Sequence, residues 1–404
     1  MKKRFKSHVA ERPIEETSEQ FRNRLGFVLL LTAVFFINFI SRIVLAPLIP
    51  TIESDLGINH TEAGSLFLFI SCGYFISLLG SGFFSSRFTH RQTIVFSGIA
   101  MGFALFGASV SHGLWAIRTT LFFLGLAAGL YLPSGIAVIT TTFDMRHWGK
   151  AIAIHEMAPN LSFVVAPLLA EAVMLRFNWR GVFVILGFGS IALAALFVRY
   201  GLGGRFHGES PSISSIKGII FNSSFWVMVF LFGLGISGTL GVFTMLPVFL
   251  VSTHGFERGM ANTLIAGSRV AGMVMTFLGG WLTDRIGAKK ILMIVFLVNG
   301  AATVLIGMAS SALVVLPVVL QPIIAACFFP AGLAALSMMS RPELRNLVVS
   351  LTVPIAFLVG GGMVPTLIGY IGDVSSFSIG ISIVGGLILT GAGFSMLIED
   401  RKRF

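Results

Sequence analysis

Long, continuously apolar runs dominate this sequence and restrict what it can fold into. The chain has 404 residues, of which 55% are hydrophobic and only 11% are charged, whereas a soluble domain carries roughly a quarter charged residues. Each run is about 20 residues or longer, enough to cross a bilayer as a helix. Backbone N–H and C=O groups cannot stay unpaired in lipid, and the alternating pattern of a transmembrane β-barrel is missing. We therefore predict an all-α integral membrane protein.

About twelve membrane spans can be placed along the chain. Their expected bounds are 25–50, 62–85, 93–110, 113–142, 149–175, 180–200, 223–251, 258–283, 290–310, 312–340, 345–371 and 376–397. The longest break between them is polar and rich in Gly and Ser, which is typical of a linker. The expected organisation is an N-terminal tail (1–24), a six-helix bundle (25–200), a linker (201–222), a second six-helix bundle (223–397) and a C-terminal tail (398–404).

The basic residues predict how the chain is oriented. The formal net charge is +11, but the positive charges are spread over the loops between spans, so we exclude nucleic acid as a partner. If the N-terminus is cytoplasmic, the outer loops contain only Arg176, Arg180 and Arg258. This asymmetry follows the positive-inside rule. We expect a multi-pass protein of a cell membrane, a bacterial inner membrane, with both termini in the cytoplasm and membrane lipid around a monomer.

Three sequence matches at similar spacing indicate an internal duplication. A loop reads Gly280-Trp281-Leu282-Thr283-Asp284-Arg285-Ile286-Gly287-Ala288-Lys289-Lys290, and a degraded copy, Gly82-Phe83-Phe84-Ser85-Ser86-Arg87-Phe88-Thr89-His90-Arg91, precedes it. Residues 131–137 resemble residues 328–334. The prolines of span five, Pro159 and Pro167, have counterparts in span eleven, Pro354 and Pro365. These prolines predict bent helices, because each removes a backbone hydrogen bond.

The loop motif resembles the signature of the major facilitator superfamily of secondary transporters. The resemblance implies two pseudo-symmetric six-helix bundles with a substrate cavity between them. It also implies that Asp284, Arg285 and Gly287 form a latch between the halves on the cytoplasmic side. The N-terminal copy departs from the pattern, since Ser86 stands at the acidic position and Thr89 at the glycine position.

Two further motifs refine this resemblance. Arg118 of span four, followed by Gly125 and Gly129, is similar to the arginine–glycine motif of the superfamily. Structural bracing or a proton-linked role is expected for Arg118 rather than direct contact with substrate. Span five lacks the Gly-Pro-Gly run of the family's drug/proton antiporters and reads Met157-Ala158-Pro159-Asn160-Leu161 instead, which counts against drug export.

Two arginines inside spans are candidates for binding an anion. Arg42 follows Asn38 by one helical turn, so both lie on one face of span one. A guanidinium in hydrocarbon is costly and should face a wet cavity or a partner, although Arg42 could instead reach the outer surface. Arg269 lies midway along span eight, where the alternative is an ion pair within the bundle. A pair formed by Arg42 and Arg269, one from each half, would resemble the arginine pair of organophosphate antiporters. This comparison is an analogy only.

Span five contains an adjacent ionisable pair, His155 and Glu156. A buried carboxylate can take up a proton, whereas pairing with a cation keeps it ionised. We hypothesise a proton-coupling site at Glu156 with His155 as a relay. The alternative is a salt bridge from Glu156 to a basic residue at the inner mouth, such as Lys150.

The remaining polar candidates are Tyr74, Tyr131 and Gln321, which could line the cavity or serve only in helix packing. Cys72 and Cys327 lie in apolar runs and are read as packing residues. No phosphate-binding loop or metal-ligand cluster occurs in the sequence, so we expect no enzyme activity, cofactor or metal.

The excess of intramembrane arginine over carboxylate predicts a secondary transporter of a small, carboxylate-like organic anion. Transport would be coupled to protons or to exchange for another anion, and would proceed by alternating access. Two alternatives stay open. One is an exporter of amphipathic or drug-like compounds, and the other is a membrane sensor or scaffold that no longer transports.

Overall fold

The computed structural model describes residues 18–208, 213–339 and 345–398. Within these residues, twelve spans are long and apolar enough to cross a membrane. The only β-type pairing among the described residues is an isolated bridge between Thr89 and His207. The predicted all-α, twelve-span fold class is therefore confirmed.

The two halves contain six spans each, several of them made of two helices. The N-terminal half comprises α1 (Ser18–Ile43) with α2 (Leu45–Leu56), α3 (His60–Arg87), α4 (His90–Ser109), α5 (Leu114–Gly129) with α6 (Tyr131–Thr142), α7 (Trp148–His155) with α8 (Met157–Met174), and α9 (Trp179–Tyr200). After α10 (Ile213–Ile220), the C-terminal half comprises α11 (Ser223–Ile236) with α12 (Val242–Ser252), α13 (Arg258–Ile286), α14 (Ala288–Met308), α15 (Val315–Ala325) with α16 (Phe328–Met339), α17 (Arg345–Phe357) with α18 (Val364–Val374), and α19 (Phe377–Phe394).

Prolines explain three of the interruptions within spans. A proline lacks an N–H, and its ring clashes with the carbonyl of the residue four positions earlier. Three helices end four residues before a proline: α1 before Pro47, α5 before Pro133 and α7 before Pro159. The bend predicted at Pro159 is confirmed, whereas Pro167 lies inside α8 without interrupting it.

Spans seven and eleven are interrupted by π-helical segments, Ser237–Gly241 and Leu358–Met363. The two segments lie against each other, and a Cβ atom on Gly360 would be only 2.6 Å from the backbone N of Ser237. Such close packing requires glycine. Single π-helical turns occur frequently at functional sites.

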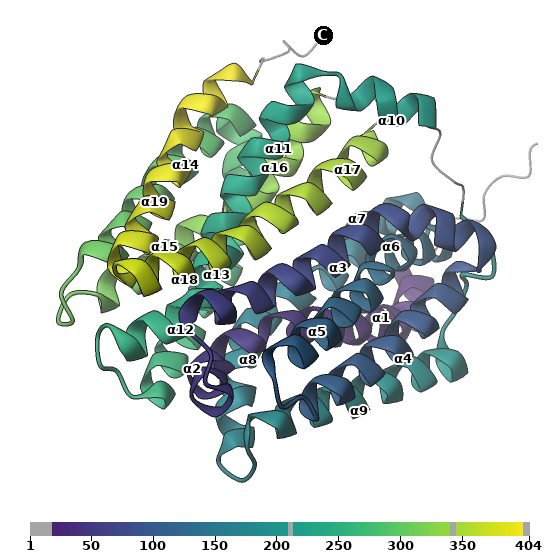
Figure 1. Ribbon diagram of the computed structural model, residues 1–404. Coiled ribbons are helices and arrows are strands. Elements are labelled where there is room, and N and C mark those ends of the chain that lie inside the picture. The colour runs from purple at the N-terminus through teal and green to yellow at the C-terminus, as the bar shows by residue number, and fades with distance from the viewer. Residues whose placement is uncertain (1–17, 209–212, 340–344, 399–404) are drawn as a thin grey trace, which may run out of the picture.

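The two halves use the same packing plan. In the first half α3 packs on α5, α4 on α9 and α1 on α8, and in the second half the equivalent helices pair as α13 on α15, α14 on α19 and α11 on α17. Figure 1 shows the two bundles, one coloured purple to teal and the other teal to yellow. The sequence duplication is therefore also a structural one.

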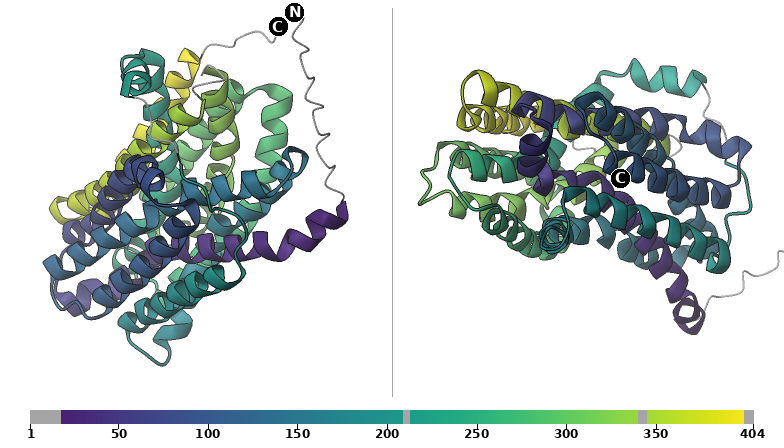
Figure 2. Two further views of the ribbon diagram at one scale, coloured as in Figure 1. Left: turned by 90° about the vertical axis from the view of Figure 1, so that its right-hand side faces the viewer. Right: turned by 60° about the horizontal axis from the view of Figure 1, so that its bottom comes forward.

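The molecule has two ends, which we name by their loops. The linker end carries α10 and the turn at Gly287, and the far end carries the turns at Gly57 and Gly255, all three glycines having positive φ. Between the halves, α2 packs on α12, α3 on α18 and α8 on α13. In Figure 1 the bundles meet around α2 and α12 and their ribbons diverge toward α10, and Figure 2 shows the start of α1 projecting from its bundle. The predicted cytoplasmic side is the linker end.

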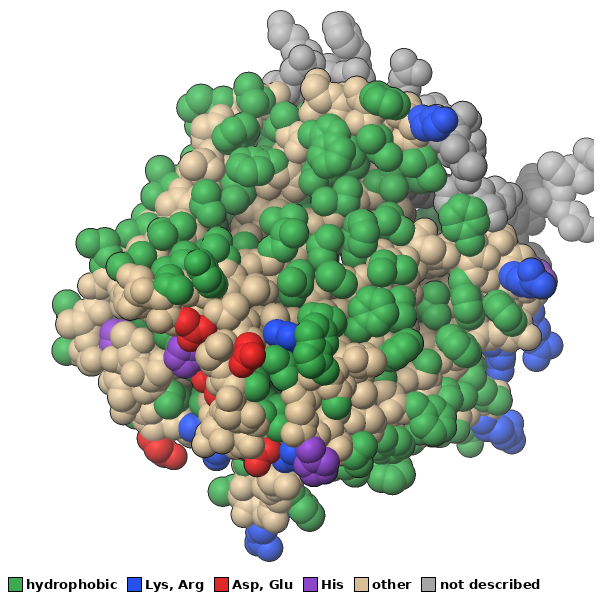
Figure 3. All heavy atoms as spheres, viewed as in Figure 1, with side chains coloured by type: hydrophobic (Ala, Val, Ile, Leu, Met, Phe, Trp, Pro, Cys, Tyr) green, Lys and Arg blue, Asp and Glu red, His purple; other side chains and the backbone are tan. Residues whose placement is uncertain are grey.

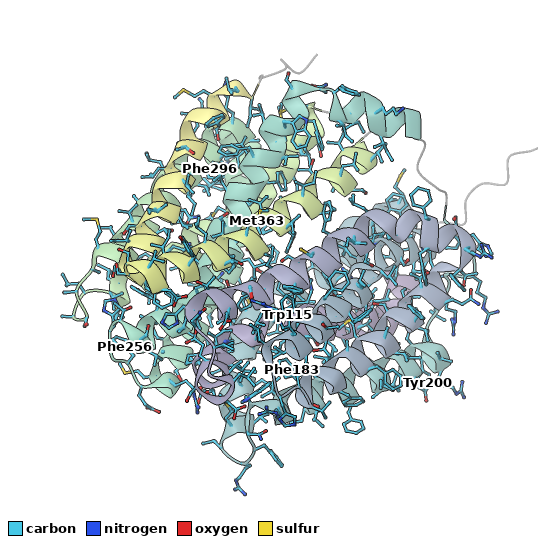
Figure 4. All side chains as sticks on the ribbon, in the orientation of Figure 1. Trp115, Phe183, Tyr200, Phe256, Phe296 and Met363 are labelled. Carbon is cyan, nitrogen blue, oxygen red and sulfur yellow. The ribbon has the colours of Figure 1, made fainter. Side chains whose placement is uncertain are left out.

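The surface reflects the membrane environment. Figure 3 shows hydrophobic side chains over most of the viewed face, with acidic, basic and histidine side chains gathered toward the far end and basic ones at the opposite edge. Large hydrophobic residues such as Phe103 and Trp115 are more than 60% exposed, and Figure 4 shows Trp115 on the N-terminal bundle. Lipid is the solvent for such a belt.

Candidate functional site

Two sets of polar contacts join the halves at the far end. Glu171, near the end of α8, accepts hydrogen bonds from Arg258 Nε at 3.0 Å and Asn262 Nδ2 at 2.6 Å, both at the start of α13. Asp373, near the end of α18, accepts hydrogen bonds from the N–H and hydroxyl of Thr61, at 2.8 and 2.5 Å, at the start of α3. In each set, a carboxylate on the fifth span of one half binds the start of the second span of the other. The two sets of contacts are therefore related by the pseudo-symmetry of the fold.

Glycines allow the backbones to approach at the same end. A Cβ on Gly64 of α3 would lie 2.5 Å from the carbonyl oxygen of Pro365, and a Cβ on Gly369 of α18 would lie 2.1 Å from that of His60. A larger side chain at either position would push α3 and α18 apart. The described structure is thus a conformation closed at the far end.

Arg42 lies between the halves, near the end of α1. The residue is only 7% exposed, and its Cζ is 4.3 Å from the ring centroid of Tyr74 and 4.8 Å from that of Phe39. Phe357 of the other half is 6.0 Å away. Among the described residues Arg42 has no carboxylate partner, and its Nε donates a long hydrogen bond to Asn38 O at 3.4 Å. The guanidinium is turned inward in this conformation and does not reach the surface.

The space beside Arg42 is small. A cavity of about 20 Å³ is lined by residues of both halves, among them Arg42, Tyr74, Thr244 and Gly361. This volume holds about one water molecule. A substrate could therefore enter only after the surrounding helices had moved.

Arg269 lies midway along α13 and is half-buried. Its Cζ is 4.5 Å from the ring centroid of Phe163 on α8 of the other half, and 4.8 Å from that of Phe243. One terminal nitrogen donates to Thr239 O at 3.0 Å, inside the π-helical segment of span seven. No carboxylate of the described residues pairs with Arg269, so the ion-pair alternative is not realised here.

His155 and Glu156 lie at the interruption of span five that Pro159 causes. The His155 imidazole is fully buried and stacks in parallel on Phe35, with ring centroids 4.5 Å apart. Its Nδ1 is 3.1 Å from Glu156 Oε1, and its Nε2 is 2.9 Å from the Tyr131 hydroxyl. The Glu156 side chain itself is 47% exposed. The partner of Glu156 is thus His155 and not Lys150.

A chain of hydrogen bonds extends from this pair into the bundle. The Tyr131 hydroxyl donates to Leu31 O at 2.8 Å. With its proton directed at that carbonyl, the phenol oxygen can accept from His155 Nε2.

Three of the predicted binding residues make their side-chain hydrogen bonds within their own bundle in this conformation, Asn38 and Tyr131 in the N-terminal bundle and Gln321 in the C-terminal bundle. Tyr131 is 1% exposed and bonded as described above. Asn38 Nδ2 donates to Ala128 O at 3.0 Å. Gln321 Nε2 donates to Gly238 O at 2.6 Å and Asn299 Oδ1 at 2.8 Å. Here these side chains hold helices of one bundle together.

The predicted cytoplasmic latch is disengaged here. Asp284, Arg285 and Gly287 are all exposed, and Arg285 stacks on its neighbour Trp281 at 4.2 Å. Asp284 has no ion pair with any described residue. This is consistent with halves that meet at the opposite end.

Arg118 braces helices of the N-terminal bundle. Its Nε and one terminal nitrogen donate to the Ser65 hydroxyl of α3 at 3.0 and 2.7 Å. Its Cζ also lies 4.9 Å from the ring of Trp115. These contacts join α5 to α3 in this conformation; the expectation of a bracing or proton-linked role stays a prediction.

The degraded loop copy contacts the linker. His90 N–H donates to Phe206 O at 3.1 Å, and Arg91 N–H donates to Gly204 O at 2.8 Å. The Arg91 guanidinium donates to Gly201 O at 2.6 Å, at the end of α9. The start of the linker is therefore fastened to the N-terminal bundle, where the acid of the motif is missing.

Sequence reasoning missed the aromatic residues around the two arginines. Phe39 could have been found, because it precedes Arg42 by three residues and shares its helical face. Phe163, Phe243 and Phe357 gave no such signal, since phenylalanine occurs throughout the spans. Their grouping depends on how four helices meet.

A larger cavity lies elsewhere. It has a volume of about 680 Å³ and is an apolar groove between α3, α4 and α5. Its walls include Phe96, Phe103 and Phe123, whose rings are more than half exposed, so the groove faces the membrane. Among the described residues no group of His, Cys, Asp and Glu is arranged to hold a metal ion.

Twelve spans in two related bundles, with an arginine from each bundle at their interface, define a multi-pass membrane protein. The sequence profile of the Major Facilitator Superfamily matches residues 31–280 and 258–403. These segments cover most of the chain, so the protein belongs to this superfamily. Its members are transporters, and the prediction that the chain is not an enzyme is confirmed.

Similar sequences have differing named substrates. The chain is 20% identical over 248 residues to multidrug resistance protein MdtL of Shewanella sp. (strain ANA-3), covering 61% of this chain and 63% of that protein. It is 25% identical to the probable L-galactonate transporter of Escherichia coli K12 (64% and 61% covered). It is 22% identical to the probable sulfoacetate transporter SauU of Cupriavidus necator (63% of each covered). The matched segments thus span just under two thirds of these relatives.

Solved structures show the same fold. A bacterial homolog of the human lysosomal transporter Spinster, in an inward-facing and unoccupied conformation, superposes with a TM-score of 0.81 at 16% identity, covering 95% of this chain and 98% of that one. A D-xylose–proton symporter superposes with a TM-score of 0.77 at 14% identity, covering 92% and 97%.

Proposed function

We propose that this protein is a secondary active transporter of a small organic anion. The observation that carries the proposal is the pair Arg42 and Arg269, one from each half. Both lie at the interface without a carboxylate partner among the described residues. Two of the similar proteins have names that specify organic anions, L-galactonate and sulfoacetate.

The physical reason is charge compensation. A cation kept out of water costs several kcal/mol unless it is paired. The aromatic faces around Arg42 and Arg269 stabilise each guanidinium by about 0.5–2 kcal/mol, which leaves most of that cost uncompensated. An anion that binds both halves would supply the missing charge, and the planar guanidinium suits carboxylate or sulfonate oxygens.

Alternating access would follow from the far-end contacts. Breaking the Glu171 and Asp373 contacts, and engaging the Asp284–Gly287 loop at the linker end, would turn the molecule to its opposite conformation. A ligand drives such a change only by its difference in affinity for the two states. Here the difference would come from the small cavity beside Arg42, which has to widen to admit a substrate.

Proton coupling is assigned to Glu156 and His155. Glu156 is half-exposed at the interruption of span five, and it contacts the buried His155, which in turn contacts the Tyr131 hydroxyl. A change in the protonation of Glu156 would therefore act on this buried pair. Exchange of one anion for another is the alternative, and it needs no titrating group.

Uptake of radiolabelled carboxylates into proteoliposomes tests the proposal. Arg269→Ala should lower uptake at least about tenfold, since it removes a charged hydrogen-bond donor. Arg269→Lys should also lower it, because the planar fork is lost. If both variants transport like the unchanged protein, the anion site is misplaced.

A second candidate is export of amphipathic, drug-like compounds. It is favoured by the apolar groove of about 680 Å³ between α3, α4 and α5, and by the similarity to the protein named MdtL. Drug susceptibility of cells expressing Phe103→Arg, a charge placed in the groove, would distinguish the two. A loss of drug resistance without any change in anion uptake would favour export.

A further inference from the structure

The two arginines are separated by an aromatic pair. Phe39, which contacts Arg42, and Phe163, which contacts Arg269, meet edge to face with ring centroids 5.4 Å apart. A chain of contacts therefore runs from Arg42 through Phe39 and Phe163 to Arg269. Phe243 also contacts Arg269 and packs on Phe163, with ring centroids 4.8 Å apart.

This arrangement limits what one anionic group can reach. Charged hydrogen bonds from a guanidinium to an oxygen are about 2.7–2.9 Å long. Because two rings stand between the guanidiniums in this chain of contacts, we expect that one compact carboxylate does not contact both while the rings stay in place. A ligand that binds both arginines must carry one acceptor group on each side of the rings.

The number of charges at the interface also favours a ligand with two acidic groups. The interface holds two guanidiniums without carboxylate partners among the described residues. Glu156, the carboxylate at the interruption of span five, is paired with His155 at 3.1 Å. A monoanion would leave one cation uncompensated, whereas an anion with two charged groups would neutralise both.

We propose that the substrate is a dianion with two separated acidic groups, such as a dicarboxylate or a sulfocarboxylate, and that Phe39 and Phe163 select it. The short apolar middle of the ligand would lie along the edges of the two rings. This inference rests on the proposed anion transport and specifies its substrate class.

Binding to the purified full-length protein in detergent tests the inference with matched ligands. Succinate is compared with butyrate, and sulfoacetate with acetate, by calorimetry at one pH and salt concentration. The dianion should bind at least about tenfold more tightly than its monoanion. Arg42→Gln and Arg269→Gln should each reduce the affinity for the dianion to within about twofold of the affinity for the monoanion.

The ring variants test the selecting role. Phe39→Leu and Phe163→Leu keep the apolar character but remove the aromatic partition, so they should shrink the preference for the dianion at least about threefold. Phe188→Leu, an exposed phenylalanine on α9, is the matched control and should leave the preference unchanged. Thermal unfolding of each variant shows whether it is folded.

The outcomes separate this inference from the proposed function. Equal binding of monoanion and dianion to the unchanged protein overturns the dianion assignment and leaves anion transport standing. Unchanged preference in both ring variants overturns the role of Phe39 and Phe163. Binding of none of the four ligands, together with no carboxylate uptake in proteoliposomes, contradicts the proposed function itself.

Discussion

At the residue scale, the assembly of Tyr131, His155 and Glu156 combines a structural and a functional role. The imidazole is fully buried, yet both of its nitrogens have partners and one of those partners is exposed. A buried polar group without a partner costs about 1–3 kcal/mol, so each member depends on the others. The Glu156 carboxylate is the exposed end of this assembly.

Tyr131→Phe should destabilise the protein without changing its shape. The substitution removes the hydroxyl, so His155 Nε2 and the Leu31 carbonyl lose a partner inside the bundle. We expect a loss of about 1–3 kcal/mol in the free energy of unfolding, seen as a lower Tm in detergent. Tyr200→Phe is the control, because Tyr200 is 62% exposed (Figure 4). Equal Tm values for the two variants would contradict the hydrogen-bond chain.

Glu156→Gln should separate transport from proton coupling. An amide cannot take up a proton, so uptake driven by an imposed pH gradient should fall to the level without a gradient. Counterflow exchange of labelled for unlabelled anion needs no net proton movement and should persist. Both are measured in proteoliposomes, with Glu257→Gln as an exposed carboxylate control. Gradient-driven uptake that survives in Glu156→Gln removes the coupling role.

At the element scale, the polar contacts that join the halves at the far end are made by helix ends. The carboxylates at the ends of α8 and α18 bind the starts of α13 and α3, where helix N-termini favour negative charge. Because the two sets are equivalent in the duplicated fold, they can open together. The exposed Asp284–Gly287 segment lies at the opposite end of α13. One helix therefore connects the far-end contacts to the predicted latch at the linker end.

Glu171→Gln should weaken the far-end closure. The amide loses the charge that Arg258 and Asn262 contact, and charged hydrogen bonds are stronger than neutral ones. Spin labels at His112→Cys and Thr253→Cys, in a background without Cys72 and Cys327, report the far-end distance by pulsed electron resonance. We expect a larger population with a longer distance in Glu171→Gln.

The control for this measurement is Glu257→Gln at the same end of the molecule. Glu257 is exposed and has no side-chain hydrogen bond as the N-cap of α13. Its distance distribution should match that of the unchanged protein. A far-end distance that is identical in Glu171→Gln would show that the carboxylate does not hold the closure.

A glycine pair on α3 offers a steric test of the same closure. Gly64→Ala places a Cβ 2.5 Å from Pro365 O, whereas Gly80→Ala on the same helix meets nothing within 4 Å. Overpacking of this kind costs about 1–3 kcal/mol, and here it affects only the conformation closed at the far end. Gly64→Ala should therefore lengthen the far-end distance and Gly80→Ala should not. The reverse result would mean that α3 and α18 do not approach as described.

At the scale of the whole molecule, the protein consists of two related bundles held together at one end. The start of the linker is fastened to the N-terminal bundle through Arg91 and the backbone of residues 204–206. Movement of one half against the other must therefore be taken up further along the linker. The apolar belt between the charged ends places the interface within the membrane.

The linker end is predicted to be cytoplasmic, and cysteine labelling checks this. His112→Cys lies at the far end and Lys290→Cys at the linker end, and both positions are exposed. In intact cells a membrane-impermeant maleimide should label His112→Cys, and it should label Lys290→Cys only after permeabilisation. The opposite pattern would reverse the orientation that the loop charges predict.

Local chemistry explains what could be predicted from sequence. Apolar runs must become helices in lipid, prolines must interrupt them, and a repeated motif implies a repeated bundle. For this reason the spans, the bend at Pro159 and the superfamily resemblance were all accessible without a structure. The candidates Arg42, Arg269 and Glu156 were found because an ionisable residue in an apolar run is unusual by itself.

The contacts of those residues could not be predicted, because each depends on segments that are distant in sequence. Gln321 was a cavity candidate, but it meets a carbonyl of the π-helical segment, which no sequence pattern had indicated. Phenylalanine is common in every span, so nothing singled out Phe39 and Phe163. The sequence by itself determined that the chain is a duplicated helical membrane protein with isolated cations. Only the tertiary structure decided which end is closed and what stands between the two arginines, because helix-to-helix packing sets both.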